Sequence, residues 1–577
     1  MRKWLFELNH SLLGLETASI FHIIILIVLC GVLYFPYLGN TPFFDKGEPR
    51  EALAVQDIVQ RGEWLFPLKR ATAIPSKPPL FHWSAALTYQ ATGTLNEATI
   101  RFPSAFYATL GVLLLYLLGR KLYGGEIGLL AGAILATTLI YSNQAVSARV
   151  DMTLCFFVTV SLILFYSLYR GFLSHQLWYL LFYAIVGIGA LAKGPLGILL
   201  PGLVIAVFLM MKKNWQLLSK FAFHPGIAIA VVLAAGWYGL AITRGGEGFV
   251  DRQLLQENLE RFFGGSGHSH PVYHYLSYLF LLGIPWSLFF PFVLWDYLRK
   301  GLIRNDNRLF LLLWFLVMFV FFSVSAGKRP VYLLPIFPAI SLLVAVWLSE
   351  VKSADGIRGI LFRAIALFAA VTGLILLLVV VGDLWSHDPA WFFSPIERLL
   401  KPKDRANFAL IMDELANFGW RFDVPALLCA FLWISVAVCL WQSRLRVAAQ
   451  RLILISVVMI YVARSLMIPE IAEGKSYREF VKEIGERVQP GDKLFLHGAF
   501  NSDPVVFYHG GVIDELDRSV QLVVDKAGRG NAYIIMDERT WKRIREVKPD
   551  LPAPVLKSRG KGPEGDAPLV LVQAKIS

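Results

Sequence analysis

Charged residues and cysteines are both scarce in this chain of 577 residues. Asp, Glu, Lys and Arg make up 17% of the sequence, whereas 56% of the residues are hydrophobic. Because soluble domains carry about 25% charged residues, this composition excludes an ordinary soluble enzyme. The four cysteines stand in apolar runs without the spacing of a metal site, so neither a disulfide framework nor a cysteine-bound zinc is expected.

Common nucleotide-binding and hydrolase signatures are also missing. The sequence contains no P-loop, no G-x-S-x-G motif and no dinucleotide fingerprint. The net charge of +13 does not indicate nucleic acid as a partner, because the Lys and Arg residues of membrane proteins gather in cytoplasmic loops.

Long apolar runs dominate the chain. Runs of about 20 residues, enough to cross roughly 30 Å of hydrocarbon, recur along most of its length. They predict an all-α polytopic membrane protein with about 13 transmembrane helices, the first of them an uncleaved span. The predicted spans are centred near Leu26, Leu113, Ala133, Val160, Val186, Val204, Val231, Leu281, Leu316, Leu342, Leu374, Phe431 and Ile460.

A second, soluble domain follows the last span. We expect residues 1–468 to form the transmembrane domain with its loops, and residues 469–577 to form a small α/β domain. Helices are predicted at residues 476–488 and 538–547, and strands at residues 493–496, 505–508, 532–536 and 569–572.

The distribution of basic residues orients the bundle. With the N-terminus inside, inner loops hold about eighteen basic residues and short outer loops about four, which fits the positive-inside rule. The outer face then collects most of the unusual polar sequence together with the C-terminal domain. These outer segments are residues 45–77, 149–151, 193–195, 243–273 and 328–330.

The first outer loop carries the candidate acids. Asp45 and Glu48 could each serve as a general base or bind a metal, or else act as a helix cap or a solvated acid. The stretch that begins at Glu48 and continues to Gln60 is amphipathic, as in helices that lie on a bilayer surface.

Several basic and aromatic residues lie at the outer ends of spans. Lys77 precedes two prolines and Lys193 precedes Gly194-Pro195, so each is either a phosphate ligand or a lysine snorkelling to the interface. Arg149 and Asp151 form either a local ion pair or part of a site. Tyr332 is either an interfacial aromatic residue or a hydrogen-bond donor to phosphate.

Taken in order, these motifs resemble a known family. They are E-P-R at 48–50, G-E-W-L-F-P at 62–67, K-P-P-L at 77–80, R-F-P-S-A at 101–105, A-R-V-D-M at 148–152, K-G-P at 193–195, E-N-L-E-R-F at 257–262 and K-R-P-V-Y-L-L-P at 328–335. Over about residues 35–338 the set resembles the bacterial GT-C membrane glycosyltransferases, within them the aminoarabinose transferase and protein mannosyltransferase-like group.

The resemblance implies a GT-C fold and an inverting glycosyltransferase at the periplasmic face of the inner membrane of a Gram-negative bacterium. The donor would be a polyprenyl-phosphate sugar, and the acceptor a hydroxyl of lipid A, a glycan or a protein. Asp45 and Glu48 would supply the catalytic carboxylate. The substrate-binding residues would be Arg50, Lys77, Arg149, Asp151, Lys193, Glu257, Arg261 and Tyr332.

Two departures from the family pattern leave alternatives open. Counted back from Trp64, the family's loop aspartate falls on Gly47, so the key carboxylate is Asp45 or Glu48. Ser76 and Asn258 stand where the aminoarabinose transferases carry metal-linked residues. No cofactor is therefore firmly predicted, and a divalent metal stays open, with ligand candidates Asp45, His268 and His270.

Two other functions remain compatible with the sequence. One is a flippase or transporter of lipid-linked sugars, which would favour charged residues in the middle of spans. The other is a non-catalytic envelope assembly protein that acts through its C-terminal domain.

Overall fold

The computed structural model describes most of the chain. It covers residues 16–260 apart from 71, 72 and 75, then 270–299, 305–351, 357–386, 419–516 apart from 499, 532–549, 551–562 and 567–574, together with residues 397, 398, 400, 405 and 408.

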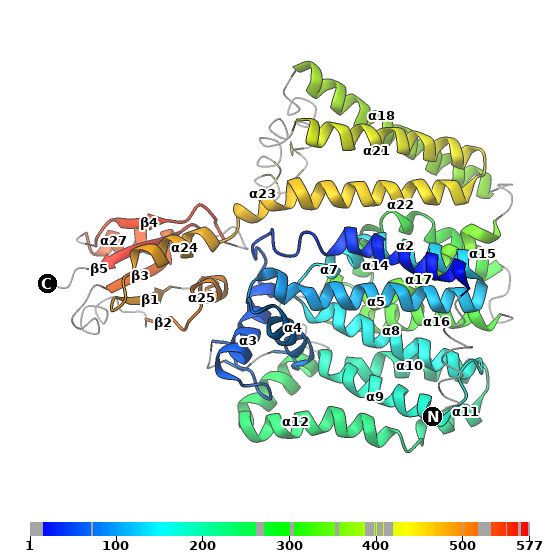
Figure 1. The fold of residues 1–577 in the computed structure, drawn as a ribbon, viewed down its shortest axis with the longest axis horizontal. Coiled ribbons are helices and arrows are strands. Elements are labelled where there is room, and N and C mark those ends of the chain that lie inside the picture. The colour runs from blue at the N-terminus through cyan, green and yellow to red at the C-terminus, as the bar shows by residue number, and fades with distance from the viewer. Residues whose placement is uncertain are drawn as a thin grey trace.

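The protein is a multi-pass helical membrane protein with a small mixed sheet at its C-terminus (Figure 1). In the described residues, ten helical segments are long and apolar enough to cross a membrane, or eleven when the bent pair α6–α7 is counted as one span. The long helices are α2 (Thr17–Tyr34), α5 (Glu97–Tyr123), α6 (Gly125–Thr137), α7 (Leu139–Ala145), α8 (Val150–Tyr169), α9 (Gln176–Lys193), α10 (Leu196–Met211), α12 (Ile227–Phe249), α16 (Asp306–Val324), α17 (Phe337–Glu350), α18 (Ile357–Ser386), α21 (Trp420–Trp441) and α22 (Leu445–Val462).

Two predicted spans are shorter or broken, which explains the difference from about thirteen. The span near Val204 is α10, which has only 16 residues. The span near Leu281 is divided into separate short helices around Gly283 and Pro285. The shorter helical segments of the bundle are α11 (Trp215–Ala222), η2 (Val250–Glu260), α14 (His274–Leu282), η3 (Trp286–Leu288), α15 (Phe290–Arg299), η5 (Pro330–Ile336), η6 (Ala463–Met467) and α23 (Ile468–Glu473).

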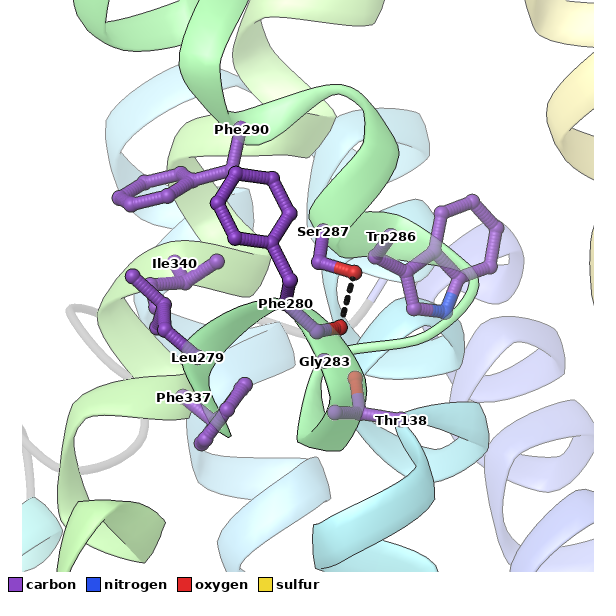
Figure 2. Close-up of a pocket in the computed structure, with 9 residues that line it drawn as sticks. All are labelled: Thr138, Leu279, Phe280, Gly283, Trp286, Ser287, Phe290, Phe337 and Ile340. Carbon is purple, nitrogen blue, oxygen red and sulfur yellow. Dashed lines mark hydrogen bonds between the residues drawn. The ribbon is translucent and has the colours of Figure 1, made fainter. Parts of the chain in front are cut away.

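The broken span packs against the bend between α6 and α7, which amounts to 69°. At this bend the indole N–H of Trp286 donates to Oγ1 of Thr137 at 3.1 Å, and the backbone N–H of Leu139 donates to the carbonyl of Ile284 at 3.2 Å. Figure 2 shows the small apolar pocket at this junction and the Ser287 hydroxyl donating to the carbonyl of Phe280 at 2.6 Å. The broken span and the bent pair α6–α7 thus provide hydrogen-bond partners for each other's polar groups. Such partners are needed inside a membrane because water is scarce there.

Helices α3 (Gly47–Arg61) and α4 (Leu80–Thr92) form a cap at one end of the bundle (Figure 1). The Asp45 side chain accepts the first N–H groups of α3, and the helix ends at Gly62 with φ 70°. The predicted amphipathic helix is therefore confirmed. It does not rest on the bilayer surface, however, because eleven of its fifteen residues are buried against neighbouring protein.

The C-terminal domain lies beside the same end of the bundle as α3 (Figure 1). Its five strands are ordered β2-β1-β3-β5-β4, with β1 parallel to β2 and β3, and β5 antiparallel to β3 and β4. Its elements are α24 (Arg478–Arg487), β1 (Lys493–His497), α25 (Asp503–His509), β2 (Asp514–Glu515), β3 (Ala532–Asp537), α27 (Glu538–Val547), β4 (Pro554–Lys557) and β5 (Leu569–Ala574).

One predicted strand of this domain is wrong. Residues 505–508, read as a strand from their apolar and β-branched character, form part of helix α25. Pro504 occupies the first turn of this helix and Gly510, with φ 79°, ends it. The other predicted strands and both predicted helices of the domain are confirmed.

Candidate active site

A narrow pocket at the α3 end of the bundle gathers most of the predicted site residues. It has a free volume of ≈ 20 Å³. Its lining residues are Arg50, Glu51, Lys77, Arg149, Val150, Asp151, Lys193, Arg329, Val331 and Tyr332. Segments that lie far apart in the sequence therefore meet at one place, as the predicted outer face requires.

The lining of this phosphate-sized pocket is predominantly cationic. Five of its residues carry a positive charge and two carry a carboxylate. Arg329 is a cation that the sequence analysis did not single out, although it stands in the K-R-P motif. An excess of cations in a partly desolvated pocket favours an anionic ligand.

The two lysines of the pocket are each held by an acid. Lys193 contacts Asp151, and its ammonium nitrogen lies 4.4 Å from the ring centroid of Tyr332. Nζ of Lys77 lies 2.6 Å from Oε2 of Glu257, and both side chains are at least nine-tenths buried. The two lysines come from different segments. Each ion pair holds the ammonium group of its lysine in place at the pocket.

Glu51 connects the pocket to α4. One of its carboxylate oxygens accepts from Arg50 at 2.7 Å, and the other lies 2.9 Å from Nε2 of His82. Burial by itself would raise the pKa of Glu51, but Arg50 and His82 together hold that pKa below its usual range. Glu51, which the sequence analysis passed over, is therefore an ionised anchor for Arg50.

The Glu48 carboxylate is fully engaged inside the protein. It receives two hydrogen bonds from Arg101, at 2.7 and 2.8 Å, and a third from the backbone N–H of Ala148 at 2.9 Å. Arg101 also donates to the carbonyls of Leu38 and Thr41. The pair thus ties α3 to α5 and to the start of α8. The only sequence signal for Arg101 was its place in an R-F-P-S-A motif.

Asp45 is oriented but accessible. Its Oδ1 accepts from the backbone N–H groups of Gly47 and Glu48 at 2.6 and 2.7 Å, while Oδ2 lies 3.6 Å from Nη1 of Arg149. The side chain is 42% exposed. Asp45 therefore stands at the rim of the narrow pocket, next to one of its cations.

Gly47 allows Arg149 to reach that position. A Cβ atom on Gly47 would lie 1.9 Å from Nη1 of Arg149. A side chain at the position that matches the family aspartate without gaps would therefore displace the guanidinium of Arg149.

A wider cavity adjoins the narrow pocket. Its volume is ≈ 410 Å³, and it shares Arg50 and Glu51 with the narrow pocket. Its other lining residues are Ala54, Lys69, Ala73, Ile74, Ser76, His82, Gly248, Asp251, Arg252 and Gln256. The cationic narrow pocket and the wider cavity are thus neighbours that share a wall at Arg50 and Glu51.

Among the described residues, the metal candidate His270 does not line the narrow pocket or the wider cavity. Arg261 and His268 lie outside the described residues. His270 is exposed, and its ring stacks on that of His274 with centroids 4.0 Å apart. Within the part of the chain that the structure describes, no group of three or more His, Cys, Asp or Glu residues could hold a metal ion.

Comparisons with known proteins find sugar transferases among the proteins that this chain is similar to. The family model for dolichyl-phosphate-mannose-protein mannosyltransferase matches residues 76–238. An undecaprenyl phosphate-α-4-amino-4-deoxy-L-arabinose arabinosyl transferase of Pectobacterium atrosepticum is 29% identical over 389 residues, 65% of this chain and 67% of that protein. An uncharacterized protein of Aquifex aeolicus is 29% identical over 323 residues, or 55% of this chain. The match covers 62% of that relative, which is less than two thirds of its length.

A solved structure shares the fold over nearly the whole chain. The crystal structure of ArnT from Cupriavidus metallidurans bound to undecaprenyl phosphate superposes with a TM-score of 0.75, at 20% identity, over 96% of this chain and 97% of that one. At this level of identity the likeness shows the fold. It confirms the predicted architecture of a helical membrane domain followed by a small mixed-sheet domain.

Proposed function

We propose that this chain, a membrane glycosyltransferase that resembles the bacterial aminoarabinose transferases, transfers a sugar from a polyprenyl-phosphate donor to an acceptor hydroxyl at the periplasmic face of the inner membrane. The acceptor class that we propose is a hydroxyl of lipid A, a glycan or a protein. The observation that carries the proposal is the narrow pocket, whose lining has five cations from separate segments and two carboxylates.

The narrow pocket suits the lipid phosphate. The phosphate of the donor gains negative charge as its bond to the sugar breaks. Cations that are already fixed in place stabilise this developing charge more than the ground state, and they do so without reorganisation. Asp151 and Glu257 keep Lys193 and Lys77 in position. Because the lining residues carry more cations than acids, a net positive field remains for the phosphate.

The group transfer is a single displacement at the anomeric carbon. The acceptor hydroxyl oxygen forms a bond to that carbon, and the bond from the carbon to the phosphate oxygen breaks with its electron pair. The lipid phosphate leaves with this pair, and the hydroxyl proton passes to the Asp45 carboxylate, so the anomeric configuration inverts. Two backbone N–H groups fix Oδ1 of Asp45, which supports this role by orienting the carboxylate.

The wider cavity suits the transferred sugar. It begins at Arg50 and Glu51, where the narrow pocket ends, and its volume of ≈ 410 Å³ is in the range of small-molecule sites. Nδ1 of His82 is buried without a partner among the described residues, and His82 lines this cavity. A sugar hydroxyl is the type of group that would satisfy such a nitrogen.

The experiment that tests the proposal compares Asp45→Asn with the unmodified protein. Purified protein in nanodiscs is incubated with a panel of labelled polyprenyl-phosphate sugars and membrane extract, and labelled products are identified by mass spectrometry. We expect Asp45→Asn to lower turnover by about 10²- to 10⁴-fold while donor binding persists, because a general base is lost. Glu126→Gln is the matched control, since Glu126 is 81% exposed and lies in α6 rather than in the pocket. Near-normal turnover of Asp45→Asn would show that the base is assigned wrongly.

A further inference from the structure

One wall of the wider cavity is a short hairpin in the first outer loop. The backbones of Lys69 and Ala73 exchange two hydrogen bonds, each with an N–O distance of 2.8 Å. Arg70 follows Lys69 with a φ of 55°, a left-handed conformation that a residue with a side chain rarely adopts without support. Lys69, Ala73 and Ile74 all line the cavity. The position of this hairpin therefore decides the shape of the chamber.

One carboxylate of the C-terminal domain, that of Asp503, contacts both basic residues of the hairpin. Oδ2 of Asp503 lies 2.8 Å from Nζ of Lys69, and Oδ1 accepts from Nη2 and Nε of Arg70 at 2.5 and 3.0 Å. Asp503 is 4% exposed. Arg70 has two further contacts in the same domain, at 2.7 Å to the Ser502 hydroxyl and at 2.5 Å to Glu515.

Asp503 itself belongs to a helix that is anchored to the bundle elsewhere. Helix α25 packs on α3, as Figure 1 shows. The hydroxyl of Tyr508 accepts from the backbone N–H of Phe43 at 2.8 Å and donates to Glu97 at 2.9 Å. Nε2 of Gln60 donates to the carbonyl of Gly510 at 2.6 Å. The far end of α25 is thus fixed, so its first residue is a firm support for the hairpin.

We propose that Asp503 is a positioning residue that holds the cavity wall in place from the C-terminal domain. It neutralises the ammonium group of Lys69, which would otherwise add an unpaired charge to the chamber, and it supports the left-handed turn at Arg70. The C-terminal domain then supports one wall of the substrate chamber without lining it. The identity of the ligand in the chamber rests on the proposed function, whereas the bracing of the wall does not.

A labelling experiment tests the brace without any activity. The four native cysteines are buried, so Ser76→Cys introduces one thiol in the cavity wall next to the hairpin, at a position that is only 8% exposed. We expect the rate of maleimide labelling at this thiol to rise about tenfold or more when Asp503→Asn is added, because a charge-assisted contact that holds the wall is lost. Asp503→Glu should restore a slow rate. An unchanged rate in Asp503→Asn would overturn the proposal.

Kinetics supply the second readout. We expect Asp503→Asn to raise the donor KM about tenfold and to lower kcat less, because the hairpin lines the wide cavity and not the narrow pocket. Glu515→Gln is the matched control, since this carboxylate meets the same Arg70 but is 64% exposed, so its loss should leave KM unchanged. If Asp503→Asn lowers the melting temperature but leaves the donor KM unchanged, Asp503 has only a structural role and the proposal is overturned. Absence of any transferase activity in the unmodified protein would contradict the proposed function, and the labelling result would still decide the brace.

Discussion

Gly47 packs against Arg149 so closely that no side chain fits between them. A Cβ atom at position 47 would lie 1.9 Å from Nη1 of Arg149 and 2.8 Å from its Cζ. These atoms belong to the far end of a flexible side chain, so in Gly47→Ala the guanidinium moves and the backbone of α3 stays. Arg149 would then leave its places at 3.6 Å from Asp45 and 3.5 Å from Asp151, and the pocket would lose one of its cations.

The expected loss follows from the type of contact. A hydrogen bond to a charged group contributes about 1.5–3 kcal/mol, so the displaced Arg149 should lower kcat/KM by roughly 10- to 150-fold. Stability should change little, because Gly47 lies at the start of a helix, where alanine is at least as well tolerated as glycine. Gly47→Ala therefore separates activity from folding.

The assay measures kcat/KM on the donor for Gly47→Ala, Arg149→Ala and the double variant. If the glycine acts through Arg149, the double variant is no worse than Arg149→Ala alone, so the two effects are not additive. Gly485→Ala is the control, since this glycine also lies in a helix and a Cβ there would meet no atom within 4 Å. Unchanged kcat/KM in Gly47→Ala, or fully additive losses, would refute the reasoning.

Two further predictions concern the charges of the site. Lys77→Ala and Lys193→Ala should each lower turnover by about 10- to 150-fold. A double-mutant cycle should show non-additive effects, because both cations act on one phosphate. Full additivity with active single variants would contradict the shared site. Glu48→Gln should destabilise the fold by about 3–5 kcal/mol, because it leaves buried Arg101 without its carboxylate. Thermal melting in detergent measures this loss, and a stable but inactive Glu48→Gln would instead favour Glu48 as the base.

The sequence alone determined the class of the protein and the membership of its site. Apolar runs of spanning length fix a helical membrane protein, because the bilayer allows few other solutions. The same patterns predicted the small C-terminal domain with its mixed sheet. The order of the motifs predicted the type of enzyme. Six of the predicted site residues line the narrow pocket, because charged groups at the ends of apolar spans are easy to recognise in a sequence.

Only the tertiary structure distinguishes the surroundings of the two candidate carboxylates. Asp45 and Glu48 look equivalent in the sequence, three residues apart. Glu48 is occupied by Arg101, 53 residues away, while Asp45 faces the rim of the pocket. The arginine that binds Glu48 lies on another helix, and local patterning contains no information about it.

The tertiary structure likewise decided the role of the C-terminal domain. The residues 505–508 have the composition of a strand, but the proline before them and their packing on α3 favour a helix. Lys69 and Arg70 appeared as two more charges of the first loop, and their partner Asp503 is more than 400 residues away. Burial gives such a contact its strength, and burial arises only when distant segments fold together.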